Sequence, residues 1–324
     1  MLQKDIFTIS SPESFKETAL RVFRFQYHNT PVYREFCDLL GTKEEDVTML
    51  EDIPFLPIQF FKDRSVVTKD TDVQKIFTSS GTTGSILSKH LIADLTLYET
   101  SFLKTFTQFY GAPEDWVILA LLPSYLEREG SSLVYMAKQL IDKSESLDSG
   151  FYLYDTENLV KKLQKLESQQ RKVLLLGVSH ALLDLIEEHS LQLRSTQVME
   201  TGGMKGRRKE LIRDELHDLL TKGLGVKYIH SEYGMTELLS QAYSQGNGLF
   251  ECPPWMKVFT RDTEDAMSYV TKKAGGINII DLANIYSCSF IATQDLGKVY
   301  SDGSFEILGR FDTSDIRGCN LMVL

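Results

Sequence analysis

The sequence of 324 residues has no long hydrophobic run, and it carries fewer basic than acidic residues. The longest apolar stretches, at 116–122 and 173–176, are far too short to span a bilayer. Residues 1–5 lack the apolar core of an export signal. The 35 basic and 45 acidic residues give a net charge of −10, which disfavours nonspecific binding to nucleic acids or anionic membranes. We therefore expect a soluble cytoplasmic protein that is not integral to a membrane and has no nucleic-acid partner.

The four cysteines lack the spacing that zinc sites and disulfide frameworks require. Cys37, Cys252, Cys288 and Cys319 form no CxxC pair, so we expect free thiols. Cys37 and Cys288 have apolar neighbours and are interpreted as buried small hydrophobic residues. The sequence also has no Gly-x-Ser-x-Gly segment, which argues against a serine hydrolase.

Amphipathic segments alternate with short apolar runs through most of the chain. Ser11-Pro12-Glu13 predicts the start of an opening helix, and further helical patterns occur at 95–109, 157–166 and 181–188. Apolar runs at 116–122, 173–176 and 226–229 separate them. This order predicts an α/β fold with mainly parallel β-α layers.

A smaller β-rich part is predicted after about residue 276. Short strands are expected at 277–281 and 287–292, followed by a hairpin with Asp302-Gly303 at its turn. The two prolines in 53–58 favour an extended segment that approaches the strand-like stretch 73–77. We expect one large domain over residues 1–308, with β-α units to about 276 and the β-rich part at about 277–308, and then a tail at 309–324.

A cluster of hydroxyl residues and glycines follows the stretch 73–77. It is made of Ser79, Ser80, Gly81, Thr82, Thr83 and Gly84. Glycine lets backbone N–H groups converge on an anion, and Ser and Thr hydroxyls add uncharged donors, so a phosphate loop is indicated. Ser85 stands where a Walker A loop needs lysine, which argues against a P-loop NTPase. An ordinary surface turn is the alternative interpretation.

Three further segments stand downstream of this loop. They are Tyr233-Gly234-Met235-Thr236-Glu237, Thr293-Gln294-Asp295-Leu296-Gly297 and Gly309-Arg310-Phe311-Asp312. Together with the loop they resemble, in the same order, the nucleotide and hinge motifs of the adenylate-forming (ANL) enzymes. The resemblance implies an ANL-type large N-terminal domain with a smaller β-rich subdomain. In the second of these motifs, Gln294 replaces the glycine usual in that family.

The resemblance implies ATP and Mg²⁺ as cofactors, and it gives each motif a role. Activation of a carboxylate by AMP needs donors around the phosphates, a divalent cation and an acid for the ribose hydroxyls. The loop at 79–84 would supply the phosphate donors. The other implied roles are Thr236 at the α-phosphate, Glu237 on Mg²⁺, Tyr233 with Gly234 and Met235 at adenine, Gly202 and Gly203 bordering adenine, Asp295 on the ribose, and Arg310 near ribose or phosphates.

The two ends of the chain narrow the resemblance. Segments 29–34 and 53–62 look like the opening of phenylacetate-CoA-ligase-type enzymes, whose mobile lid with its catalytic lysine would follow residue 324. Without that lid, and with Cys319 in Arg317-Gly318-Cys319-Asn320, the chain is similar to LuxE-type acyl-protein synthetases. That family implies conversion of a fatty acid to acyl-AMP, transfer to Cys319, and delivery to an acyl-CoA-reductase-type partner. A thiol on a terminal tail can move between two sites, and Arg317 would favour its thiolate.

Two other functions stay open. One is a truncated acyl- or aryl-CoA ligase that transfers to coenzyme A or a carrier protein, and the other is a catalytically inactive nucleotide-binding subunit. His180 follows a predicted strand and is a candidate for the acyl pocket, although a buried structural histidine is an equal alternative.

Overall fold

The computed structural model describes residues 2–80, 86–123, 129–202 and 211–311. Within these residues a six-stranded sheet has the order β5-β4-β6-β7-β8-β9, and all neighbours are parallel except β8 and β9. Its strands are β4 (Val117–Leu121), β5 (Gly150–Phe151), β6 (Val173–Val178), β7 (Thr196–Thr201), β8 (Ile229–Tyr233) and β9 (Ala242–Ser244). The predicted α/β fold with a mainly parallel sheet is confirmed.

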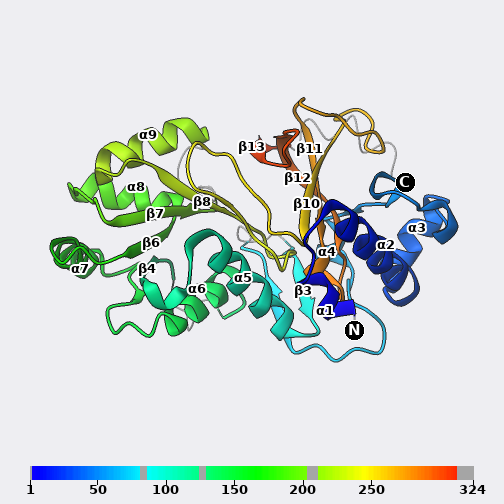
Figure 1. The fold of residues 1–324 in the computed structure, drawn as a ribbon, viewed down its shortest axis with the longest axis horizontal. Helices are drawn as coiled ribbons and strands as arrows, with labels where there is room; N and C mark the ends of the chain where they lie inside the picture. The colour runs from blue at the N-terminus through cyan, green and yellow to red at the C-terminus, as the bar shows by residue number, and fades with distance from the viewer. Residues whose placement is uncertain (1, 81–85, 124–128, 203–210, 312–324) are drawn as a thin grey trace.

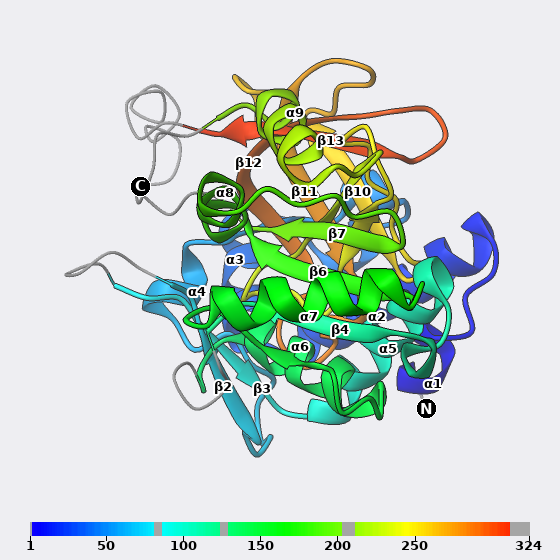
Figure 2. The same ribbon diagram turned by 90° about the vertical axis from the view of Figure 1, so that its left-hand side faces the viewer.

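Helices cover both faces of this sheet. Figure 1 shows α8 and α9 above the sheet and α5 and α6 below it. The helices of this part are α5 (Leu95–Tyr110), α6 (Ser132–Lys143), α7 (Thr156–Ser168), α8 (Ser179–Glu188) and α9 (Arg213–Leu224), with the 3₁₀ turn η3 (Pro113–Asp115). In Figure 2, α7 crosses in front of the sheet. Side-chain oxygens of Asp94, Ser131 and Asp155 accept backbone N–H groups at the starts of α5, α6 and α7, which explains where these helices begin.

A second sheet is mainly antiparallel, with the order β1-β12-β11-β10 and β13 on β12. Its strands are β1 (Leu56–Pro57), β10 (Met256–Arg261), β11 (Gly275–Asp281), β12 (Phe290–Val299) and β13 (Phe305–Arg310). The predicted hairpin is present between β12 and β13, where Gly303 has φ +89°. Strand β13 runs through position 308, where the sequence analysis placed the end of the large domain. That division of the chain stays a prediction.

Two strands begin later than their apolar runs suggested. Strand β8 starts at Ile229 and not at Val226, because Gly225 ends α9 in the left-handed region with φ +69° and the chain needs further residues to turn into the sheet. Strand β12 starts at Phe290 and not at Ser287, because the N–H of Ser287 donates to the carbonyl of Asn284 and closes a turn. The apolar runs marked the strands but not their first residues.

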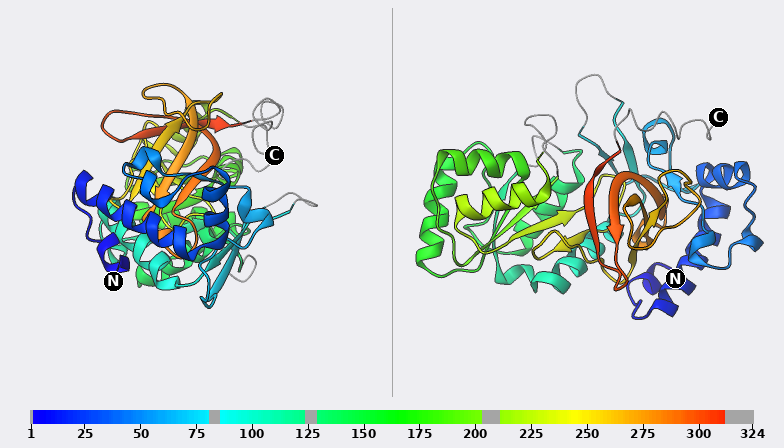
Figure 3. Two further views of the ribbon diagram at one scale, coloured as in Figure 1. Left: turned by 90° about the vertical axis from the view of Figure 1, so that its right-hand side faces the viewer. Right: turned by 90° about the horizontal axis from the view of Figure 1, so that it is seen from above.

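The N-terminal helices pack on the outer side of the second sheet. Seen from above in Figure 3, right, the second sheet lies between the six-stranded sheet and the N-terminal helices. These are α1 (Leu2–Ile6), α2 (Pro12–Asn29) and α3 (Pro31–Leu39), followed by the short turns η1 (Glu44–Asp46), η2 (Leu50–Asp52) and α4 (Phe60–Asp63). Helix α2 begins as predicted, with Ser11 capping it and Pro12 in its first turn. Among the helices described, none is long and apolar enough to cross a membrane.

A short hairpin connects the two sheets near the candidate phosphate loop. It consists of β2 (Lys75–Thr78) and β3 (Lys89–Ile92), which pair antiparallel. A further 3₁₀ turn, η4 (Leu282–Asn284), follows β11 and completes the described elements. Residues from these three segments meet the end of β8, and the candidate site is built there.

Candidate active site

Tyr233, at the end of β8, joins the two sheets through a hydrogen bond. Its hydroxyl donates to Oδ2 of Asp295 at 2.8 Å, while Nε of Arg310 lies 3.0 Å from Oδ1 of the same carboxylate. Asp295 and Arg310 are directly opposite each other in the β12–β13 pairing, which explains the ion pair. The structure thus brings together three residues that the sequence motifs separated by up to 77 positions.

The aromatic ring of Tyr233 is held on edge by two phenylalanines. Its centroid lies 5.8 Å from that of Phe250 and 5.5 Å from that of Phe305. Burial, together with the negative charge of Asp295, raises the pKa of Tyr233 well above its ordinary value, so its hydroxyl stays protonated and remains a donor. The side chain of Arg310 is 78% exposed, whereas that of Asp295 is 8% exposed. The arginine side of this ion pair is therefore open to solvent.

Glu237 follows the same strand end and is 5% exposed. Burial raises the pKa of its carboxyl, whereas a hydrogen bond with Ser88 and the positive charges of Arg310 and Lys62 act in the opposite direction. In the described part of the chain, no three or more His, Cys, Asp or Glu side chains are grouped so that they could hold a metal ion. A single buried carboxylate nevertheless fits Mg²⁺, since this ion is usually held by one or two carboxylates together with nucleotide phosphates.

The first residues of the candidate phosphate loop lie beside Glu237. The N–H of Ser79 donates to the carbonyl of Ser88 at 3.1 Å, and the N–H of Ser88 donates to Oγ of Ser79 at 3.0 Å. Because Ser88 also bonds Glu237, the loop begins one side chain away from the candidate metal ligand. Ser80 follows directly. Gly81, Thr82, Thr83 and Gly84 lie outside the described residues.

The glycine segment follows β7, the neighbour of β8. Gly202 adopts φ +66°, and its carbonyl accepts a 2.6 Å hydrogen bond from Oγ of Ser179. Gly203 lies outside the described residues. His180, the candidate acyl-pocket residue, is buried in the first turn of α8, next to Ser179. These contacts put the segment and His180 at the carboxyl ends of adjacent parallel strands, where open α/β sheets bind ligands.

Gly234 and Met235 are half-buried between Tyr233 and Thr236. A Cβ on Gly234 would lie 2.3 Å from Oε1 of Glu232, so a larger residue there would displace that carboxyl group. Glu232 was not anticipated from the sequence. It is buried and accepts a hydrogen bond from the hydroxyl of Thr201, and burial raises its pKa to about 7. Its place directly before the aromatic motif was the available signal.

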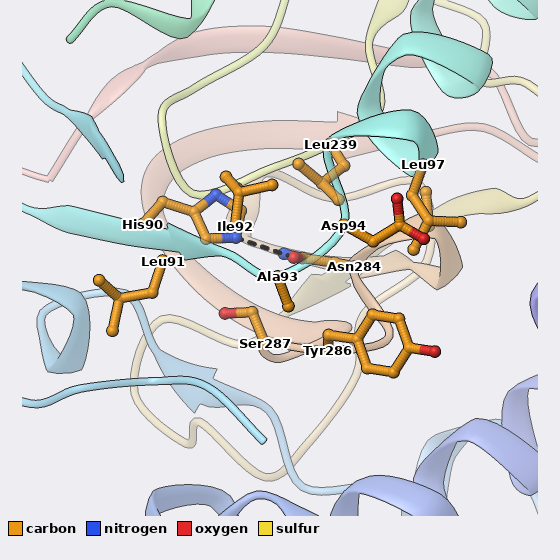
Figure 4. Close-up of a pocket in the computed structure, with 11 residues that line it drawn as sticks. His90, Leu91, Ile92, Ala93, Asp94, Leu97, Leu239, Asn284, Tyr286 and Ser287 are labelled. Carbon is orange, nitrogen blue, oxygen red and sulfur yellow. Dashed lines mark hydrogen bonds between the residues drawn. The ribbon is translucent and has the colours of Figure 1, made fainter. Parts of the chain in front are cut away.

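His90 and Asn284 were also missed. They lie 194 positions apart in the chain, yet Nε2 of His90 is 2.9 Å from Oδ1 of Asn284, as the dashed line in Figure 4 shows. Both line a small pocket between β3, α5 and η4 that is also bordered by Asp94, Leu97 and Tyr286. None of the predicted site residues lines this pocket. No sequence motif marks either residue, so nothing in the sequence would have revealed the pair.

Three of the four cysteines lie in the described residues, and they are free thiols as predicted. Cys37 and Cys288 are buried, and Cys252 is half-buried. Burial raises the pKa of all three thiols, to about 12 for Cys37. A thiol with such a pKa is a weak nucleophile at neutral pH. Cys319 lies outside the described residues.

Several solved structures share this fold. The 2-hydroxyisobutyryl-CoA ligase in complex with 2-HIB-AMP and CoA matches with a TM-score of 0.68 and 14% identity, over 94% of this chain and 72% of that one. ATP-bound MatB from Rhodopseudomonas palustris matches with a TM-score of 0.55 and 18% identity, over 87% of this chain and 58% of that one. An ATP-bound RpMatB-BxBclM chimera matches with a TM-score of 0.56, and this chain spans 49% of its length. This chain therefore shares its fold with these proteins.

Sequence comparisons point to the LuxE-type acyl-protein synthetases. The family model "Acyl-protein synthetase, LuxE" matches residues 4–105. A long-chain-fatty-acid–luciferin-component ligase of Vibrio harveyi is 24% identical over 323 residues, which cover 92% of this chain and 84% of that protein. The ligase of the same name from Photorhabdus luminescens is 33% identical over 70 residues, 60% of its length. The predicted resemblance to LuxE-type acyl-protein synthetases is confirmed, and with it the prediction of a ligase.

Proposed function

We propose that this protein activates a fatty acid with ATP and then transfers the acyl group to its own Cys319. The observation that carries the proposal is the arrangement around Asp295. Its carboxylate is held by Tyr233 and Arg310 at the junction of the two sheets, and the buried carboxylate of Glu237 lies beside the start of the candidate phosphate loop. Asp295, the candidate ribose ligand, and Glu237, the candidate metal ligand, thus come from distant segments and lie near one end of β8.

Each candidate residue has a role that its environment fits. Asp295, oriented by two donors, would accept hydrogen bonds from the ribose hydroxyls. Glu237 would hold Mg²⁺, because the desolvation that raises its pKa is relieved by a bound cation. Ser79 and Ser80, with the glycines and threonines that follow, would donate to the phosphates. Thr236 would donate to the α-phosphate, where charge accumulates as the acid attacks.

The proposed reaction has two steps, formation of acyl-AMP and transfer of the acyl group to Cys319. A carboxylate oxygen of the acid attacks the α-phosphorus of Mg²⁺-ATP, which forms acyl-AMP and releases pyrophosphate. The Cys319 thiolate then attacks the acyl carbonyl carbon, so that a C–S bond forms, the C–O bond to AMP breaks and AMP leaves. A reductase-type partner would take the acyl group from the thioester. The burial of Cys37, Cys252 and Cys288 supports Cys319 as the acceptor, since a buried thiol is poorly placed to receive a long acyl chain.

Labelling with a radioactive fatty acid tests both steps. Incubation with Mg²⁺-ATP should give a hydroxylamine-labile protein label that Cys319→Ser abolishes, while acid-dependent exchange of pyrophosphate into ATP continues. Cys252→Ser, the matched control, should keep the label. Label retained by Cys319→Ser would contradict the acceptor role. Acyl-CoA formed on addition of coenzyme A would support the CoA-ligase alternative, and absence of exchange with any acid would support an inactive nucleotide-binding subunit.

A further inference from the structure

Strand β3 places one histidine against the turn that carries Thr236 and Glu237. Nδ1 of His90 lies 2.7 Å from the carbonyl oxygen of Thr236, and Nε2 lies 2.9 Å from Oδ1 of Asn284. Nδ2 of Asn284 donates in turn to the carbonyl oxygen of Glu237 at 2.8 Å. His90 and Asn284 therefore hold two consecutive carbonyl groups of this turn, one directly and one through the amide.

The same strand reaches the candidate phosphate loop at its other end. Ser88, which leads into β3, exchanges two hydrogen bonds with Ser79, and its side chain acts to lower the pKa of the carboxyl of Glu237. The short stretch from Ser88 to His90 thus contacts the loop at one end and the turn at the other. The spacing between the two candidate ATP-binding segments depends on this stretch.

Both side chains of the histidine–asparagine pair are buried. His90 is 0% exposed, and its ring meets that of Phe61 edge-on, with centroids 5.5 Å apart. Asn284 is also buried, and its own carbonyl accepts a 3.0 Å hydrogen bond from Nε2 of Gln26 on α2. Burial and these contacts keep the pair in one geometry. Figure 4 shows the pair facing each other between β3 and η4.

We propose that His90 is a positioning residue that sets the distance between the loop at Ser79 and the carboxylate of Glu237. The inference rests on the proposed function, in which the loop holds phosphate and Glu237 holds Mg²⁺. The Mg²⁺-ATP complex touches both segments at once, whereas free ATP has no metal to meet Glu237. An error in spacing therefore weakens binding of the metal complex more than binding of free ATP.

The chemistry of the contacts indicates which of them matters more. A carbonyl oxygen only accepts, so the bond to Thr236 needs a proton on Nδ1 of His90. Burial lowers the pKa of His90 to about 4, so at neutral pH the ring is neutral and carries one proton. The carbonyl oxygen of Thr236 and Oδ1 of Asn284 both only accept, so the neutral ring donates to one of them. The contact to Thr236 is the shorter, 2.7 Å against 2.9 Å, and we assign the proton to Nδ1, which leaves Nε2 in contact with Oδ1 of Asn284 without a proton between them. Loss of this contact has the larger expected effect.

Three substitutions separate the volume of the ring from its two contacts. His90→Phe keeps a ring and removes both contacts, His90→Asn places an amide N–H near the position of Nδ1, and His90→Gln reaches toward the position of Nε2. Titration calorimetry gives the dissociation constant of ATP with Mg²⁺ and with EDTA. We expect His90→Phe to reduce the gain in affinity due to Mg²⁺ about tenfold, with His90→Gln next and His90→Asn least affected. The affinity in EDTA should stay close to that of the wild type.

Controls keep the outcomes distinct. His28→Asn changes an exposed histidine, and it should bind like the wild type. Urea unfolding identifies variants that fail to fold. If folded His90→Phe and His90→Gln keep the full gain due to Mg²⁺, the positioning role is wrong. If the wild type binds no ATP at all, the proposed function is wrong, and a wild type that binds ATP equally with and without Mg²⁺ contradicts the role of Glu237 and this inference with it.

Discussion

The two sheets treat their buried carboxylates differently. At the end of β11, Asp281 accepts from the N–H groups of Leu239 and Ser240 at 2.7 and 2.9 Å, and from the hydroxyl of Ser240. On β8, the one donor that the structure describes for Glu232 is the hydroxyl of Thr201. Burial acts to raise the pKa of both groups, but only Asp281 has backbone N–H donors to oppose it. Several fixed donors favour the ionised form of a buried carboxylate, whereas a single donor leaves the effect of burial largely unopposed.

A neighbouring charge strengthens this difference. Burial also acts to raise the pKa of Glu200 on β7, yet hydrogen bonding with His217 and the positive charge of Arg213 outweigh it and lower that pKa. Nη1 of Arg213 lies 2.6 Å from Oε1 of Glu200, so this carboxylate is ionised. Its negative charge adds to the burial of Glu232 in keeping the latter protonated. The parallel sheet thus pairs a carboxylate whose pKa is lowered with a carboxyl group whose pKa is raised to about 7.

The largest effect on stability is expected at Asp281. Asp281→Ala removes the carboxylate that accepts from the buried N–H groups of Leu239 and Ser240, so both donors lose this partner. We expect the free energy of unfolding to fall by about 3 kcal/mol or more. Asp281→Asn keeps one acceptor oxygen and should cost less. Urea unfolding followed by tryptophan fluorescence measures both. A change below about 1 kcal/mol for Asp281→Ala would refute the structural role assigned to this charge.

The next effect concerns Glu232 and depends on pH. Its folded pKa of about 7 lies above the ordinary value of 4.5, so between these values the folded state binds more protons than the unfolded state. Stability from this group is therefore lost as pH rises from about 4.5 through 7. The glutamine of Glu232→Gln stays neutral, so this variant should gain stability over the wild type with rising pH, by up to roughly 3 kcal/mol at pH 8.

The control for this pH dependence is an exposed carboxyl group. Glu264→Gln, in a loop between β10 and β11, should follow the wild-type curve of stability against pH. Urea midpoints of the three proteins from pH 5 to 8 make the comparison. Parallel curves for Glu232→Gln and the wild type would mean that Glu232 ionises normally in the folded protein, and the contrast between the sheets would fail.

The smallest effect on stability is expected at Arg310. Its guanidinium is 78% exposed, so its ion pair with Asp295 is screened by water and should contribute less than about 1 kcal/mol. Arg310→Ala should nevertheless weaken Mg²⁺-ATP binding about tenfold, because it removes one of the two groups that orient Asp295. Lys298→Ala, on the same strand as Asp295, is the control. Unchanged ATP affinity in Arg310→Ala would separate this arginine from the nucleotide site.

The sequence predicted the arrangement along the chain better than the contacts across it. The start of α2 at Ser11-Pro12 and the turn at Asp302-Gly303 were correct, because caps and tight turns depend on a few adjacent residues. The starts of β8 and β12 were wrong, because the turns that delay them depend on Gly225 and on the bond from Ser287 to Asn284. In both strands, apolar character extended beyond the paired residues.

The amino-acid sequence by itself determined the order of β-α units, the hydroxyl-and-glycine cluster and the motif residues Tyr233, Glu237 and Asp295, since residue type and spacing are local properties. Only the tertiary structure decided that Asp295 lies between Tyr233 and Arg310 and that His90 supports the turn at Thr236. It also decided that burial raises the pKa of Glu232 to about 7. Hydrogen bonds between distant segments and desolvation depend on how the segments pack, and one-dimensional spacing carries no record of that packing.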